Sequence, residues 1–184
     1  METIVLIGAS TGGPGHLKKI LSSLKGDTKA SFVIAQHMNK DVMESFVSQL
    51  SESSKLPVVL VKNNKKISQS YVYICSNSLK FSIKNFNIYL DETTLEDIYT
   101  PSINILFDSA CKLLPKYKII SILLTGIGDD GAASMHSLYK NGAYCISECQ
   151  KSAIVFGMPK QAYIANNEIS VMCLNQIIKF LKDV

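Results

Sequence analysis

The sequence predicts an α/β domain built around a mainly parallel β-sheet. Short β-branched runs alternate with amphipathic segments along most of the 184 residues, which is typical of repeated βα units. A chain of this length buries a sizeable core without disulfides or metal. No linker, repeat or low-complexity tract divides it. We therefore expect one domain over residues 1–184.

Hydrophobic periodicity indicates where each element lies. Apolar runs predict strands at 3–8, 31–36, 57–61, 118–124, 143–147 and 169–173. Amphipathic stretches predict helices at 14–25, 40–53, 101–115, 131–141, 159–166 and 174–183. Residues 71–90 instead alternate apolar and polar side chains between Ser-Asn-Ser and Lys-Asn breaks, so we expect an inserted antiparallel hairpin or meander there.

Composition and charge exclude several classes of protein. The content of 47% hydrophobic and 18% charged residues is that of an ordinary soluble domain. The first apolar run, Ile4 to Ile7, is too short for a signal peptide or a membrane span, so a cytoplasmic location is expected. The net charge of +4 is modest, and without a block of five like charges we expect no nucleic-acid partner. The basic cluster at 62–66 is interpreted as a solvated loop.

The cysteines predict neither a metal site nor a disulfide framework. They form an odd set with no C-x-x-C pair and no histidines at ligand spacing: Cys75, Cys111, Cys145, Cys149 and Cys173. We expect buried free thiols.

Three polar signals follow predicted strands. Ser10 comes after "TIVLIGA", His37 after "FVIAQ", and the pair Asp129 and Asp130 after "IISILLTGIG". Parallel strands direct their carboxyl ends to one edge of the sheet, where ligands bind. These side chains are therefore expected to meet.

A hydroxyl, an imidazole and a carboxylate are the groups that serine-dependent ester hydrolysis requires. Residues 8–12, G-A-S-T-G, match the G-x-S-x-G nucleophile elbow in its strand-to-helix context. The glycines permit unusual backbone angles, and N–H groups at the helix start would face a developing oxyanion. From residue types alone, either aspartate completes the set.

Other interpretations of the same residues remain open at this point. Ser10 would also serve as a helix cap, and the adjacent aspartates as a magnesium loop or a cap. A phosphate-binding loop is disfavoured, because neither G-x-G-x-x-G nor G-x-x-x-x-G-K-[ST] is present. The usual order of catalytic residues in α/β-hydrolases, serine then acid then histidine, would be met by Ser10, Asp130 and His136. That set requires Asp130 to contact a histidine inside the helix that follows it, so we disfavour it. His16 and His136 are weaker candidates than His37 for the base.

Five motifs together resemble one family. "IGASTGGPGHLKKIL", "AQHM", "PSINILF", "LLTGIGDDGAASM" and "VFGMPKQAY" occur in the order seen in the catalytic domain of CheB, the chemotaxis protein-glutamate methylesterase. The resemblance extends from Ile4 through the final predicted helix. It implies a doubly wound α/β domain that hydrolyses glutamate methyl esters on the cytoplasmic helices of chemoreceptors, releases methanol and, in many members, deamidates receptor glutamines.

The resemblance also assigns roles to residues. It places the nucleophile at Ser10, the base at His37 and the acid at Asp130, which stands directly before the glycine of the turn. It places the oxyanion donors at the backbone N–H groups of Thr11 and Ile127. It implies no cofactor, no metal and no insertion into the membrane.

Some features depart from the family pattern. Isoleucine stands at 127 where methionine is common, but a backbone donor survives that exchange. "CSNS" at 75–78 replaces a stretch usually richer in proline and glycine, so the rim of the site is expected to differ. Typical members also begin with a receiver domain and a linker. If this chain is natural as it stands, we expect basal activity without the inhibition that a receiver provides, or control by a separate protein.

Overall fold

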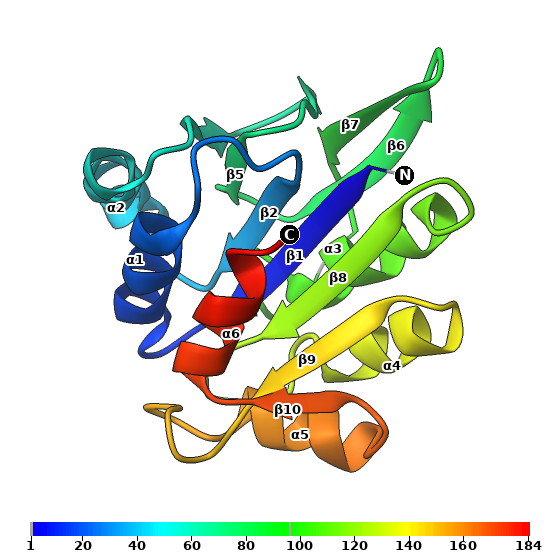
Figure 1. Cartoon of the computed structure of the whole chain (residues 1–184). Coiled ribbons are helices and arrows are strands. Elements are labelled where there is room, and N and C mark those ends of the chain that lie inside the picture. Colours follow the sequence, from blue (N-terminus) through cyan, green and yellow to red (C-terminus); the bar gives the residue numbers. More distant parts are fainter. Residues whose placement is uncertain (1, 96) are drawn as a thin grey trace.

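The computed structural model describes residues 2–95 and 97–184 and confirms the doubly wound α/β fold (Figure 1). One seven-stranded parallel sheet runs in the order β10-β9-β8-β1-β2-β5-β3. Its strands are β1 (Thr3–Ala9), β2 (Ser31–Gln36), β3 (Val58–Val61), β5 (Val72–Cys75), β8 (Lys118–Leu123), β9 (Tyr144–Glu148) and β10 (Ser170–Met172).

Helices cover both faces of this sheet. One face carries α1 (Gly13–Ser23), α2 (Lys40–Ser53) and α6 (Leu174–Leu181). The other carries α3 (Ile103–Ala110), α4 (Ala132–Lys140) and α5 (Met158–Ala165), with a 3-10 turn at Cys111–Leu113 after α3. Successive side chains of a strand point to opposite faces, so Val5 and Ile7 pack under the first set of helices while Ile4 and Leu6 pack under the second. Both cores are apolar.

The structure confirms the inserted antiparallel hairpin but starts it later in the chain than the sequence predicted. The hairpin consists of β6 (Leu79–Lys84) and β7 (Asn87–Glu92), and β4 (Lys65–Lys66) extends it to a separate three-stranded sheet. The start of the predicted range, β5, is instead a strand of the parallel sheet and lies between β2 and the edge strand β3. All four residues of β5 are buried, and a strand buried on both faces does not need a polar alternation.

The expectation of five free thiols was wrong for two of them. Cys149 and Cys173 form a disulfide between the end of β9 and the start of α6, whereas Cys75, Cys111 and Cys145 are free. The two bonded cysteines meet because β9 and β10 are neighbours in the sheet, which their separation of 24 residues did not reveal. Burial raises the pKa of Cys75 to about 12 and that of Cys145 to about 11, so both remain thiols at neutral pH.

The direction in which the strand order grows reverses beside β1. From β1 the chain turns to β2 on one side, and β8 later pairs with β1 on the other. The chain leaves β1 for α1 on one face and leaves β8 for α4 on the other, so the ends of these strands form a topological switch point, where ligands of open parallel sheets bind. Among the described residues, no helix has the length and apolar character needed to cross a membrane.

Candidate active site

Ser10 lies directly after β1, at the switch point. Its backbone N–H donates to the Thr125 carbonyl at 3.0 Å, and its own carbonyl accepts from the Gly13 N–H at 2.8 Å. The chain then enters α1 through Gly12, whose φ of 85° is strained for any residue with a Cβ. This turn leaves the serine side chain half-buried at the edge of the sheet.

His37 follows β2, the neighbouring strand. Its backbone N–H donates to the Ala9 carbonyl at 2.9 Å, which sets the two strand ends side by side. The buried Gln36 strengthens this link, because its Nε2 donates to the carbonyls of both Ser10 (3.0 Å) and His37 (2.9 Å). Gln36 was not predicted to belong to the site. A polar side chain at the end of an otherwise apolar strand was the feature that could have indicated it.

Of the two adjacent aspartates, only Asp130 lies in the site. It is fully buried, whereas Asp129 is exposed. The Asp130 carboxylate accepts from two N–H groups at the start of α3: Ile103 N to Oδ2 at 2.7 Å and Asn104 N to Oδ1 at 2.8 Å. The N-terminus of a helix stabilises an anion, so these amides offset the cost of burying the charge.

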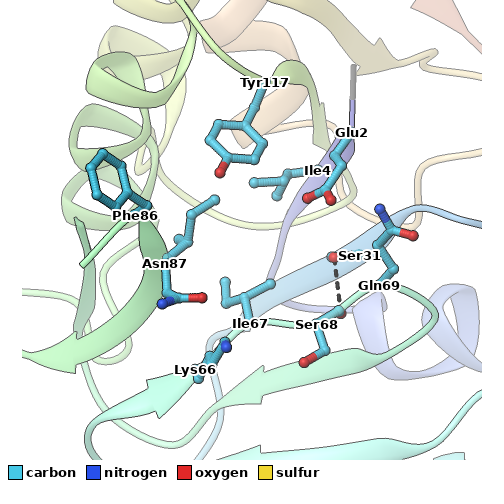
Figure 2. A pocket seen from close by; sticks show the side chains of 11 residues that line it. Glu2, Ile4, Ser31, Lys66, Ile67, Ser68, Gln69, Phe86, Asn87 and Tyr117 are labelled. Atoms are coloured by element: carbon cyan, nitrogen blue, oxygen red, sulfur yellow. Dashed lines mark hydrogen bonds between the residues drawn. The ribbon is translucent and has the colours of Figure 1, made fainter. Parts of the chain in front are cut away.

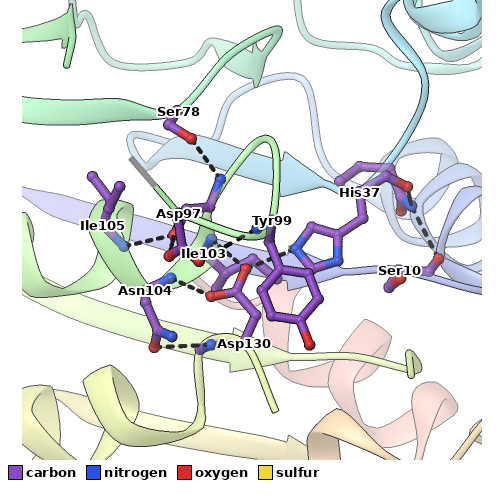
Figure 3. A network of polar contacts seen from close by, with 12 residues as sticks. Ser10, His37, Ser78, Asp97, Tyr99, Ile103, Asn104, Ile105 and Asp130 are labelled. Carbon is purple, nitrogen blue, oxygen red and sulfur yellow. Dashed lines mark hydrogen bonds and ion pairs between the residues drawn. The ribbon is translucent and has the colours of Figure 1, made fainter. Parts of the chain in front are cut away.

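The Asp130 carboxylate also orients the imidazole of His37. His37 Nε2 lies 2.7 Å from Asp130 Oδ2, although the two residues are 93 apart in the sequence. With Nε2–H donating to the carboxylate, Nδ1 is the nitrogen left to accept a proton. Figure 3 shows that Nδ1 lies on the side of Ser10. Within the described part of the chain, the Ser10 hydroxyl makes no hydrogen bond.

Tyr99 is a second residue that the sequence did not predict at this site. Its ring stacks on the His37 imidazole with centroids 4.9 Å apart and planes within 4° of parallel (Figure 3). Asp97 shapes the loop that carries it, accepting from Tyr99 N at 3.3 Å and from Ser102 Oγ at 2.6 Å. The imidazole is thus confined by a hydrogen bond at one edge and an aromatic face on one side.

The oxyanion candidates belong to the loops after β1 and β8. Gly126 allows the two loops to approach, since a Cβ placed on it would lie 2.6 Å from Ser10 Cβ. Its N–H donates to the Val155 carbonyl at 3.0 Å. Thr11 and Ile127 are among the loop residues whose N–H groups donate no hydrogen bond within residues 2–95 and 97–184. These amides are therefore unpaired at the edge where Ser10 lies.

The structure does not support the other two histidines as the base, nor the two aspartates as a magnesium-binding loop. Asp130 binds His37 rather than His136, and His16 is buried on α1 beside Glu148. In residues 2–95 and 97–184, no group of three or more His, Cys, Asp or Glu side chains is arranged to hold a metal ion.

A cavity at the opposite edge of the sheet is lined by residues that include Glu2, Ser31 and Tyr117 (Figure 2). Its Ser31 hydroxyl is already bonded to the Ser68 carbonyl.

The fold and these residues define the class: an α/β protein with serine, histidine and a buried aspartate at the switch point of a parallel sheet. The sequence matches the family described as CheB methylesterase over residues 5–181. The fold is similar to the crystal structure of the Thermotoga maritima CheB methylesterase catalytic domain. That match has a TM-score of 0.90 and 28% identity, and covers 100% of this chain and 98% of that one. This chain therefore belongs to the CheB methylesterase family.

Curated relatives agree with this assignment. A protein-glutamate methylesterase/protein-glutamine glutaminase of Carboxydothermus hydrogenoformans is 33% identical over 96% of this chain and 51% of its own length. A probable protein-glutamate methylesterase of Borreliella burgdorferi is 35% identical over 97% of this chain and 48% of its own length. The chain thus spans about half the length of these relatives.

Proposed function

We propose that this chain is a protein-glutamate methylesterase and that Ser10, His37 and Asp130 are its catalytic residues. The observation that carries the proposal is the 2.7 Å contact between His37 Nε2 and Asp130 Oδ2 beside Ser10, in a chain of the CheB methylesterase family. Relatives that match nearly all of this chain bear the same activity in their names. On this proposal, residues 1–184 constitute one catalytic unit.

The reaction we propose proceeds by two acyl transfers. Ser10 Oγ attacks the γ-ester carbonyl of a glutamate while His37 Nδ1 accepts the hydroxyl proton. The imidazolium then protonates the departing methanol, and water, activated by the same histidine, hydrolyses the acyl-enzyme. Asp130 stabilises the imidazolium through Nε2. An amide substrate would follow the same path with loss of ammonia, which is the glutaminase activity named for one relative.

The negative charge on the tetrahedral intermediate needs hydrogen-bond donors that are already in place. The backbone N–H groups of Thr11 and Ile127 are proposed for this role. What supports the assignment is that both lie in the loops at the switch point and donate to no other group of the described chain. A side-chain change at position 127 leaves such a donor intact.

The substrate we propose is the helical cytoplasmic region of methyl-accepting chemoreceptors, and the place of action is the cytoplasm. Three isoleucines on the loops at this edge support recognition of a protein surface, because apolar side chains left this accessible suit contact with a partner. They are Ile98 (89% exposed), Ile127 (63%) and Ile154 (67%). Specificity would then come from docking a receptor helix, and free methyl glutamate should be a poor substrate.

Methanol release tests the proposal directly. The wild-type chain is incubated with membranes whose chemoreceptors carry labelled methyl esters, and volatile label is measured. We expect label to be released as methanol, and no release from receptors whose methylated glutamates are replaced by alanine. If the wild-type chain released no labelled methanol, the proposed activity would be contradicted. Efficient hydrolysis of free methyl glutamate would contradict recognition by docking.

Tyr99 offers a test of how the imidazole is held. We expect Tyr99→Ala to lower kcat about fivefold, because loss of the stacked ring frees the imidazole to rotate. Tyr99→Phe keeps the aromatic face and should retain most of the activity. The measurement is methanol release under saturating substrate. A Phe variant as slow as the Ala variant would show that the hydroxyl, not the stacking, matters.

A further inference from the structure

Glu148, the last residue of β9, is a fully buried carboxylate that the proposed reaction does not use. Its Oε2 accepts from the Thr125 backbone N–H at 2.8 Å, and its Oε1 accepts from Ser152 Oγ at 2.6 Å. Oε2 also lies 3.3 Å from Nδ1 of His16, whose side chain is only 6% exposed. That nitrogen makes no hydrogen bond within the described residues, so His16 lies against the carboxylate without donating to it.

Thr125, which Glu148 holds, connects both loops of the candidate active site. Its carbonyl accepts from Ser10 N at 3.0 Å, and its hydroxyl donates to the Thr11 carbonyl at 2.8 Å. The same hydroxyl accepts from Val155 N at 2.9 Å. Ile127, the other oxyanion candidate, is two residues further along. A displacement of Thr125 would therefore move the nucleophile and both proposed oxyanion donors.

The partners of Glu148 come from three separate segments. Thr125 belongs to the loop after β8, Ser152 to the loop after β9, and His16 to the first turns of α1. A buried carboxylate is costly unless charge and hydrogen bonds compensate it, so its partners are held at short distances. Hydrogen bonds to a charged acceptor are shorter and stronger than those between neutral groups. Glu148 thus fixes these segments relative to one another.

We propose that Glu148, paired with His16, is a positioning residue of the esterase: its carboxylate holds Thr125, and through Thr125 it aligns Ser10 with the Thr11 and Ile127 amides. The inference rests on the proposed function for its substrate. It does not depend on that function for the alignment of Ser10, which can be measured separately. Glu148 itself contacts no reacting atom.

Two substitutions separate positioning from stability. Glu148→Gln keeps an oxygen that accepts from Thr125 N–H, whereas Glu148→Met has similar size and no acceptor. Both are compared with wild type and with a control at an exposed site, Glu52→Ala on α2. The measurements are kcat and KM for methanol release from methylated receptor membranes, the rate of Ser10 labelling by a fluorophosphonate, and the melting temperature.

We expect Glu148→Met to lower kcat about 30-fold with KM within about twofold of wild type, since misplaced catalytic groups slow turnover without weakening binding. Ser10 labelling should slow in parallel. Glu148→Gln should retain at least about a third of the wild-type kcat, because a neutral amide oxygen still holds Thr125. The Glu52→Ala control should match wild type in every measurement.

Three results would overturn the proposal: a Glu148→Met kcat within threefold of wild type, a loss expressed only in KM, or a Gln variant as impaired as the Met variant. Should Glu148→Met not fold, His16→Asn replaces it, with kcat expected to fall about threefold at unchanged KM. An unchanged kcat in His16→Asn would then contradict the proposal that Glu148, together with His16, positions Thr125. If wild type releases no methanol, the esterase proposal fails, and the labelling rates still decide the role of Glu148.

Discussion

Replacing Ser10 by alanine is expected to lower turnover by roughly 10³-fold or more, because nucleophile, base and acid act as a unit. The change should leave stability nearly untouched. Ser10 is held through its backbone, by Thr125, Gly13 and Gln36, and its hydroxyl makes no hydrogen bond within the described chain. The measurement is labelled methanol release from methylated receptor membranes, with the melting temperature recorded for both proteins.

A serine away from the site provides the matched control. Ser51→Ala, on the exposed side of α2, removes a hydroxyl of the same kind and should release methanol at the wild-type rate. A Ser10→Ala variant that loses only two- or threefold would contradict a nucleophilic role. In that case Ser10 would be a residue of the turn that begins α1.

Asp130→Asn is expected to have the second large effect, a fall in turnover on the order of 10³-fold. An amide presents only one acceptor oxygen, while Asp130 accepts from His37 Nε2 and from two backbone N–H groups of α3. The neutral side chain also fails to stabilise the imidazolium. Turnover and melting temperature are measured together, since loss of these hydrogen bonds should cost some stability as well.

The neighbouring Asp129→Asn variant tests the register. Asp129 is exposed, so its substitution should change turnover less than about threefold. The two variants have the same change of charge and differ by one position. Should Asp129→Asn prove the more damaging, the assignment of Asp130 as the acid would be wrong.

The elements with a clear apolar period were predictable. The strand expected at 31–36 and the helix expected at 40–53 occur with those bounds. The range 71–90 was less predictable. Its first strand, β5, is a short apolar run buried on both faces between β2 and β3, whereas the alternation of apolar and polar side chains belongs to the next strand, β6. The neighbours of β5 are set by pairing across the sheet, which a local pattern does not contain.

At the site, strand ends were predictable and their supporting contacts were not. Ser10 and His37 each follow an apolar run, so a parallel sheet brings them to one edge. Tyr99 and Glu148 gave no comparable signal. Tyr99 lies outside any predicted element. Glu148 follows the strand predicted at 143–147, a position where surface residues are also common. Their roles depend on contacts with residues distant in sequence, His37 for one and Thr125 for the other.

The sequence by itself determined the fold class, and it placed Ser10 and His37 after two strands and, through the family motif, favoured Asp130 as the proposed acid, because strand periodicity and short motifs are local properties. Only the tertiary structure decided that Nε2 of His37 faces Asp130, that α3 supplies the amides for that carboxylate, and that Cys149 joins Cys173. These outcomes depend on how the strands are ordered and how the loops pack at their ends, which no local pattern specifies.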